Sequence, residues 1–332
     1  DTLVKETTTV TKDVSGSLLI SAADGATLKG IRIGGDLILA PGVTKDVTLV
    51  DCVIQGNIRN YGTGEVRFEA PQITPESTAA KPSEVYKPGA TLDRTLEYGG
   101  KTVPIYRDRP LNVFSDVDFI WTGEENENQR RLEYLGGEFR TRYGIDVSSF
   151  QGEIDWDAVA DDNIDFAMVR VGFRGTGTGS LNTDKYYEQN IRGAMRAGLE
   201  TGVYFFAQAV TVEEAIEEAD YVISLLDGLD INGPVAYDWE MHDSTYRVYG
   251  TSPEMATACA VAFCERIKDA GYTPMVYGGT YVTYMKYDQG ALADYLSWYP
   301  EYKSEKSEKL CPTLVYHMDY WQFSSSRAVA GI

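Results

Sequence analysis

Three acidic residues have the types and spacing needed for acid–base chemistry. Asp238 and Glu240 stand two residues apart at the end of the apolar run PVAYDWE, and Asp146 lies in the earlier run GIDVS. Side chains alternate between the faces of a strand, so Asp238 and Glu240 point the same way, with Cα atoms about 6.6 Å apart, while Trp239 points to the other face. Two carboxyl groups in one site raise each other's pKa, so one can stay protonated while the other is ionised. Glycoside hydrolysis needs this combination.

Aromatic residues accompany these acids along the chain. Their flat faces can stack on sugar rings, although most aromatic residues in proteins belong to the core. The alternative to a functional site is that the acids merely cap loops or form ion pairs with Arg170. Three acids on neighbouring strands beside aromatic residues favour function over that alternative. The residues expected to bind substrate are Tyr204, Phe206, Tyr277, Trp298, Arg170 and Tyr237.

Alternating strands and helices after residue 143 must position these side chains. Strands are predicted at 144–148, 165–173, 202–209, 234–240, 274–279, 295–299 and 313–323, with helices between several of them. Thr211 with Glu214 forms a capping box, and Ser252 followed by Pro253 begins another helix. This alternation predicts an α/β fold with a parallel sheet, and the number of units favours a TIM-like β/α barrel. In such barrels the chemistry lies at the carboxyl ends of the strands.

The segment before this region has a different pattern. GSLLI, GDLIL and GNIRN begin at residues 16, 35 and 56, and an alternating stretch follows each of them. We predict a β-rich repeat domain over 1–70, either a β-solenoid, slightly favoured, or a small antiparallel β-sandwich. A proline-rich stretch opens a linker and connecting segment over 71–111, and the barrel domain is expected over 112–332.

Composition excludes several classes of function. The 332 residues contain 30 Lys and Arg against 50 Asp and Glu, a net charge of −20, which argues against nucleic-acid binding. No apolar run is long enough to span a membrane, and the first residues, DTLVKETTTV, lack the features of a signal peptide. Cys259 and Cys264 are expected to be small buried hydrophobic residues. The two histidines, His242 and His317, lie in separate segments, so we expect no metal and no cofactor.

Six segments in order resemble the glycoside hydrolase family 25 lysozymes: GIDVSSFQGEIDW, MVRVGF, GVYFFAQA, PVAYDWE, PMVYGG and YWQFSSS. The resemblance covers about 144–332 and rests mainly on DVSxxQG together with DWE. It implies an irregular barrel with fewer helices than strands and N-acetylmuramidase activity. It also implies that Glu240 is the acid/base, that Asp238 assists the substrate's acetamido group or the oxocarbenium ion, and that Asp146 is the first-strand aspartate of the site. Tyr204, Phe206, Tyr277 and Trp298 resemble the family's aromatic lining.

Two departures from the family pattern are visible. Many members have a histidine where this chain has Phe205, and members usually continue past a segment like AVAGI into a last strand with another active-site aspartate, whereas this chain stops at Ile332. Either the last barrel strand is missing from the chain, as the pattern suggests, or the barrel is closed differently.

The expected function is that of a secreted or cell-wall-associated hydrolase that cleaves the β-1,4 bond between N-acetylmuramic acid and N-acetylglucosamine. Its expected partners are peptidoglycan glycan strands, without nucleic acid and without membrane insertion, and self-association through the amino-terminal domain is left open. The alternative is an inactive carbohydrate-binding or structural cell-wall protein on the same barrel.

Overall fold

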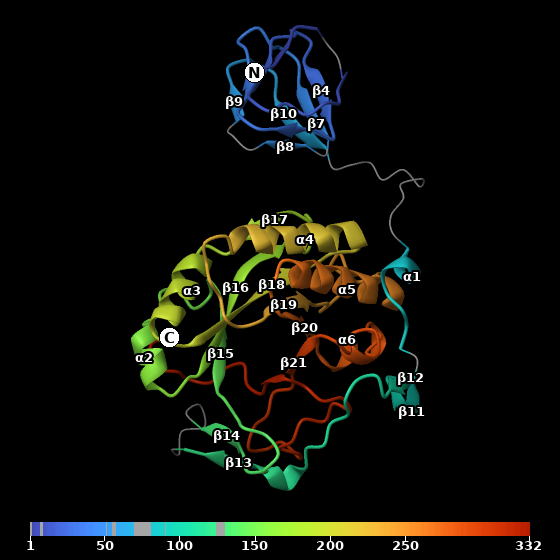
Figure 1. Ribbon diagram of the computed structural model, residues 1–332, viewed down its shortest axis with the longest axis vertical. Coiled ribbons are helices and arrows are strands. Elements are labelled where there is room, and N and C mark those ends of the chain that lie inside the picture. Colours follow the sequence, from blue (N-terminus) through green and yellow to red (C-terminus); the bar gives the residue numbers. More distant parts are fainter. Residues whose placement is uncertain are drawn as a thin grey trace. The chain divides into compact units, whose positions relative to one another are not determined.

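The computed structural model describes residues 2–6, 9–50, 52–54, 58–69, 81–89, 91–123 and 130–332 (Figure 1). The chain divides into two compact units, Asp1–Thr78 and Ala79–Ile332. The segment from 79 to 111, expected as part of the connecting region, therefore lies within the second unit.

The first unit consists of short strands that pair between successive repeats of the sequence. One sheet contains β1 (Thr2–Val4), β3 (Leu18–Ile20), β6 (Leu37–Leu39) and β9 (Ile58–Asn60). A second contains β2 (Thr9–Val10), β4 (Ala26–Lys29), β7 (Val47–Val50) and β10 (Val66–Glu69), and a third contains β5 (Arg32–Ile33) and β8 (Val53–Ile54). All pairs between these described strands are parallel, unlike those of an antiparallel sandwich.

The register of these pairs follows the sequence repeat. Leu18 pairs with Leu37, which pairs with Ile58, so equivalent residues of the three repeats stand side by side. Leu18, Leu28 and Leu37 are fully buried in the core of this unit. Apolar residues of one repeat thus cover those of the next, which is how this short segment obtains a core.

The second unit is built on one curled sheet of predominantly parallel strands. In order across the sheet these are β15 (Gly144–Val147), β16 (Phe166–Arg174), β18 (Glu200–Ala207), β19 (Val235–Trp239), β20 (Pro274–Tyr277), β21 (Leu296–Pro300) and β22 (Tyr320–Gln322). A short strand not foreseen from the sequence, β17 (Leu181–Thr183), pairs antiparallel with β16. Among the described strands β15 and β22 are the two edges, so the sheet is an open half-barrel.

Helices follow most of the parallel strands and cover the outer face of this sheet (Figure 1). They are α2 (Trp156–Asp161), α3 (Tyr187–Arg196), α4 (Val212–Leu225), α5 (Pro253–Asp269) and α6 (Thr280–Met285). Both predicted N-cap residues are confirmed, because Thr211 accepts a hydrogen bond from Glu214 N and Ser252 accepts one from Met255 N. The capping box predicted at Thr211 is formed only in part, since the Glu214 side chain accepts from Val210 N instead of from Thr211 N. The fully described stretch from β21 to β22 has no helix, so helices are fewer than strands.

Shorter elements extend the second unit. A four-residue helix, α1 (Pro82–Val85), precedes the hairpin of β11 (Leu92–Tyr98) and β12 (Lys101–Tyr106). A 3₁₀ helix (Asp116–Asp118) precedes a second hairpin, β13 (Phe119–Thr122) and β14 (Arg131–Tyr134). The strand predicted over 313–323 is shorter than expected: Leu314 and Tyr316 instead bury their side chains with Val103 and Ile105 of β12.

Cys259 and Cys264 lie on α5 and are fully buried with free thiols, so their prediction as buried hydrophobic residues is confirmed. In the part of the chain that the structure describes, no helix has the length and apolar character to cross a membrane.

Candidate active site

The three predicted acids meet at the carboxyl ends of the sheet strands. Asp146 lies near the end of β15, Asp238 lies near the end of β19, and Glu240 follows β19 directly. The carboxyl groups of Asp146 and Glu240 both act electrostatically on that of Asp238, and Glu240 also forms a hydrogen bond with it. Asp146 therefore forms one acidic cluster with Asp238 and Glu240, which follow it in the sequence by 92 and 94 positions.

Asp238 is the most enclosed of the three acids. Asp238 is only 5% exposed, and its Oδ1 atom accepts no hydrogen bond from the described residues. Burial raises the pKa of Asp238 well above its usual range, and the charges of Glu240 and Asp146 raise it further, against the opposing effect of Arg170. The surroundings of Asp238 thus favour its protonated form.

Asp146 is held by a residue from the opposite edge of the sheet. Burial raises the pKa of Asp146, whereas a hydrogen bond from Gln322 Nε2 to Asp146 Oδ2, 2.8 Å long, lowers it. The other atom of the same amide, Gln322 Oε1, accepts hydrogen bonds from the hydroxyl groups of Tyr277 at 3.4 Å and Tyr302 at 3.3 Å. Gln322 therefore joins β15, β20 and the segment after β21 around the acids.

Glu240 is partly exposed, unlike the buried Asp238. Its side chain is 25% exposed, and its Oε2 atom lies 2.8 Å from His242 Nε2. The main chain at this point is fixed by Gln208, whose Nε2 donates to the Glu240 carbonyl oxygen at 2.8 Å. Gln208 is itself anchored, because its backbone N–H donates to the buried carboxylate of Glu218, which also pairs with Arg174.

Four of the predicted aromatic residues share the inner face of the sheet with Asp238. Phe206 and Tyr277 are its direct neighbours in strand register, and Tyr277 pairs in turn with Trp298. Tyr204 and Tyr277 both pack edge-on against Trp298, with ring centroids 5.7 and 5.1 Å away. Tyr277 and Trp298 are largely buried, so they form the floor beneath the acids.

Tyr237 does not lie in the site, and its prediction as a substrate-binding residue is wrong. Its side chain is 0% exposed and packs against Phe263 of α5, with ring centroids 4.8 Å apart. Strand alternation explains this position: in β19 Tyr237 and Trp239 face the helices, whereas Asp238 faces the inner side of the sheet. Phe205 faces the helices in the same way, next to Tyr221, so it contributes nothing to the inner face.

Arg170 lies close to the acids but is occupied by other groups. Its guanidinium is hydrogen-bonded to Asp184 and Ser149, and only 13% of its side chain is exposed.

Three further residues contact the acids but are not among the site residues predicted from the sequence: Gln322, His242 and Gln208. For Gln322 a signal existed in the YWQ motif, where an amide interrupts an aromatic strand.

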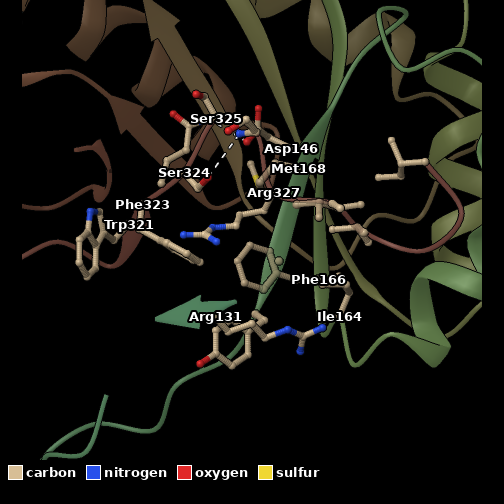
Figure 2. Close-up of a pocket in the computed structure, with 18 of the residues that line it drawn as sticks. Arg131, Asp146, Ile164, Phe166, Met168, Trp321, Phe323, Ser324, Ser325 and Arg327 are labelled. Carbon is tan, nitrogen blue, oxygen red and sulfur yellow. Dashed lines mark hydrogen bonds between the residues drawn. The ribbon is translucent and has the colours of Figure 1, made fainter. Parts of the chain in front are cut away.

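A cavity of about 780 Å³ opens beside Asp146, between the two edges of the sheet. Figure 2 shows Asp146 at one end of this cavity, Arg327 and Phe166 in its middle, and Arg131 with Ile164 at the other end. The cavity is also lined by Trp298, Tyr302 and Gln322.

A curled parallel sheet with three carboxyl groups and an aromatic floor at its carboxyl ends is the arrangement of a glycoside hydrolase. Residues 145–332 match the sequence model described as glycosyl hydrolases family 25, which is more than half of the chain, and the protein belongs to this family. The resemblance seen in the sequence is thereby confirmed.

The individual relatives compared below share about a quarter of their aligned residues with this chain. The chain is 26% identical over 190 residues to an autolytic lysozyme of Clostridium acetobutylicum, covering 57% of this chain and 52% of that protein, so it spans about half the length of this curated relative. Among solved structures, a lysozyme from Streptomyces coelicolor is 24% identical over 58% of this chain and 88% of its own, with a TM-score of 0.46. The modular autolysin LytC from Streptococcus pneumoniae is 23% identical over 71% of this chain and 55% of its own, with a TM-score of 0.49.

Proposed function

We propose that the second unit hydrolyses the β-1,4 bond between N-acetylmuramic acid and N-acetylglucosamine in peptidoglycan. Glu240 acts as the acid/base, Asp238 assists the substrate's acetamido group, and Asp146 in its ionised form stabilises the developing positive charge. Tyr204, Phe206, Tyr277 and Trp298 contact the sugars, directly or as the floor of the site.

The observation that carries this proposal is the unequal environment of two neighbouring carboxyl groups. Asp238 is buried and its pKa is raised well above the usual range, whereas Glu240 is partly exposed and can reach a substrate. Pairs of titratable groups in unlike surroundings are typical of acid/base sites. Membership in a glycoside hydrolase family agrees with this interpretation.

Substrate binding would move the proton from Asp238 to Glu240, the acid/base. When an acetamido N–H group donates to Asp238, it favours the ionised carboxylate of Asp238, and the proton then resides on Glu240. Glu240 donates this proton to the glycosidic oxygen while the acetamido oxygen attacks the anomeric carbon and the leaving sugar departs. A water molecule then opens the cyclic intermediate, and Glu240 takes up the proton of that water, so the anomeric configuration is retained.

Purified peptidoglycan provides the test. The full chain should release reducing sugar ends, and mass analysis of the products should locate the cut after N-acetylmuramic acid. Glu240→Gln should lower turnover by about 10²–10⁴-fold, because an amide cannot donate the proton, and Asp238→Asn should be nearly as damaging. Glu188→Gln, an exposed acid on α3, is the matched control and should leave turnover unchanged.

Two results would contradict the assignment. Turnover of Glu240→Gln within a few-fold of the unaltered chain would remove Glu240 from the acid role. Clean inversion of the anomeric configuration, measured by NMR on the first product, would exclude assistance by the acetamido group. Binding without any release of reducing ends would favour the alternative function, an inactive carbohydrate-binding or structural protein.

For the first unit we propose a β-solenoid that serves as a spacer, as a wall-binding face or as a surface for self-association. Its parallel pairing and repeat-by-repeat core support this. A place in the cell wall, after secretion, would bring both units to the proposed substrate.

A further inference from the structure

Phe150 is an exposed aromatic residue in the loop that directly follows β15. Phe150 is 84% exposed. Asp146 lies four residues earlier in the chain, on β15. The loop leaves the carboxyl end of β15, which is the end of the sheet that carries the acids. A single exposed hydrophobic residue needs no special explanation, so the argument depends on how this one is held.

The loop around Phe150 is fixed by a set of hydrogen bonds. The backbone N–H of Phe150 donates to Ser148 Oγ at 3.2 Å, and the N–H of Ser149 donates to the buried carboxylate of Asp184 at 2.9 Å. Ser148 N donates to the side chain of Gln151 at 2.8 Å. Phe150 is therefore presented from a well-anchored backbone, so little conformational freedom remains to be lost when a ligand binds.

Arg170 supports the Phe150 ring from one side. The Arg170 Cζ atom lies 5.0 Å from the centroid of the Phe150 ring and 5.5 Å from that of Phe173, so the guanidinium contacts both rings. Asp184 fixes the guanidinium through Nε at 2.9 Å, and Ser149 Oγ accepts from it at 3.2 Å. Burial opposes ionisation of Asp184, but hydrogen bonds from Ser149, Tyr186 and Arg170 together lower its pKa, so this ion pair persists at neutral pH.

The supported ring continues a row of aromatic residues that leads away from Asp238. In strand register Asp238 is the neighbour of Phe206, and Phe206 is the neighbour of Phe173. Neighbouring strands lie about 4.8 Å apart, so this row extends about 10 Å from Asp238 to Phe173. Arg170 then links Phe173 to Phe150 at the outer end.

We propose that Phe150 is a stacking platform for a pyranose ring of the glycan strand outside the scissile bond, with Arg170 as its support. This proposal rests on the proposed function and names a further part of the same binding site. The ligand is a neutral sugar face, because apolar C–H groups of a pyranose pack well on an aromatic ring. Arg170 thus acts on substrate through Phe150 rather than by direct contact.

Binding to uncleaved oligosaccharides provides the test. Oligomers of alternating N-acetylglucosamine and N-acetylmuramic acid, two and six sugars long, are titrated calorimetrically into the full chain carrying Glu240→Gln. Adding Phe150→Ala should raise the Kd for the hexasaccharide about tenfold and that for the disaccharide by less. Phe150→Trp should restore tight binding, whereas Phe150→Leu should not, because leucine is apolar but has no flat face.

Phe139→Ala is the matched control, since Phe139 is another exposed phenylalanine of this unit, in contact with Phe114 and His317. Its Kd values should stay within twofold of the parent. An unchanged hexasaccharide Kd in Phe150→Ala, or equal rescue by leucine and tryptophan, would overturn the platform.

Hydrolysis of the hexasaccharide by the chain with Glu240 intact is measured in parallel, so that the two proposals can fail separately. Hydrolysis without an effect of Phe150 refutes the platform alone. Binding that depends on Phe150 without hydrolysis refutes the proposed reaction alone, and neither binding nor hydrolysis refutes both.

Discussion

Replacing Gln322 by leucine should damage the site through Asp146 rather than through the fold. Leucine has a similar size, but it removes the donor that lies 2.8 Å from Asp146 Oδ2 and the acceptor of two tyrosine hydroxyl groups. Asp146 then keeps its burial and the nearby charge of Glu240, both of which raise its pKa, and loses the larger of the two hydrogen-bond effects that lower it. The variant should therefore hold less of Asp146 in its ionised form.

The magnitude follows from the type of hydrogen bond that is lost. A hydrogen bond to a charged group contributes about 1.5–3 kcal/mol, which corresponds to a loss of about ten- to hundredfold in kcat/KM if Asp146 must be ionised in the transition state. The sign of the pH dependence is fixed as well. Because the pKa of Asp146 rises further, the loss should be greatest at acidic pH and should diminish as the pH increases.

The assay is release of reducing ends from soluble glycan fragments between about pH 4 and pH 8. Tyr302→Phe removes one hydroxyl partner of Gln322 but leaves the hydrogen bond to Asp146. Its kcat/KM should therefore fall less, and the acidic limb of its pH profile should stay at the same pH. A Gln322→Leu profile with the same acidic limb and a kcat/KM within twofold of the unaltered chain would refute the reasoning.

Two further predictions concern stability and the division of the chain. Burial raises the pKa of Glu218 to about 7 against the effect of Arg174. The folded chain therefore binds this proton more tightly than the unfolded chain, so the free energy of unfolding should fall by about 3 kcal/mol as the pH rises from about 4.5 to about 7. Urea unfolding at pH 5 and pH 8 measures this, and an equally steep dependence in Glu218→Gln would contradict it. A chain beginning at Ala79 should cleave soluble glycan as fast as the full chain and differ only in sedimentation with intact walls, whereas one beginning at about residue 112 lacks the β11–β12 hairpin and should be less stable. Slow turnover by the Ala79 chain would show that the first unit helps to build the site.

The sequence predicted the part of the fold that depends on local periodicity. Alternating apolar strands and capped helices indicated the parallel sheet, and the Asp238–Glu240 spacing indicated which side chains share a face. The same alternation places Tyr237 on the outer face, so that error came from selecting aromatic residues by proximity instead of by parity.

Other features depend on contacts between distant segments. The apolar run 313–319 looks like a strand, but Leu314 and Tyr316 lie against β12, about 200 residues earlier in the chain. The contact of Gln322 with Asp146 spans 176 residues and joins opposite edges of the sheet. Periodicity within one segment carries no information on such pairs, and for that reason Gln322 was not expected in the site.

The position of Asp238 on β19 also has a consequence for motion. All five residues of β19 are buried, and the strand is paired on both sides, with β18 and β20. Backbone amides in such a strand exchange their hydrogens with solvent only when the whole unit opens, whereas exposed loops can open locally. The acid pair is therefore tied to the slowest-exchanging part of the molecule. Substrate capture and release must be accomplished by the loops that surround the pair, while the carboxyl groups keep their geometry from one turnover to the next.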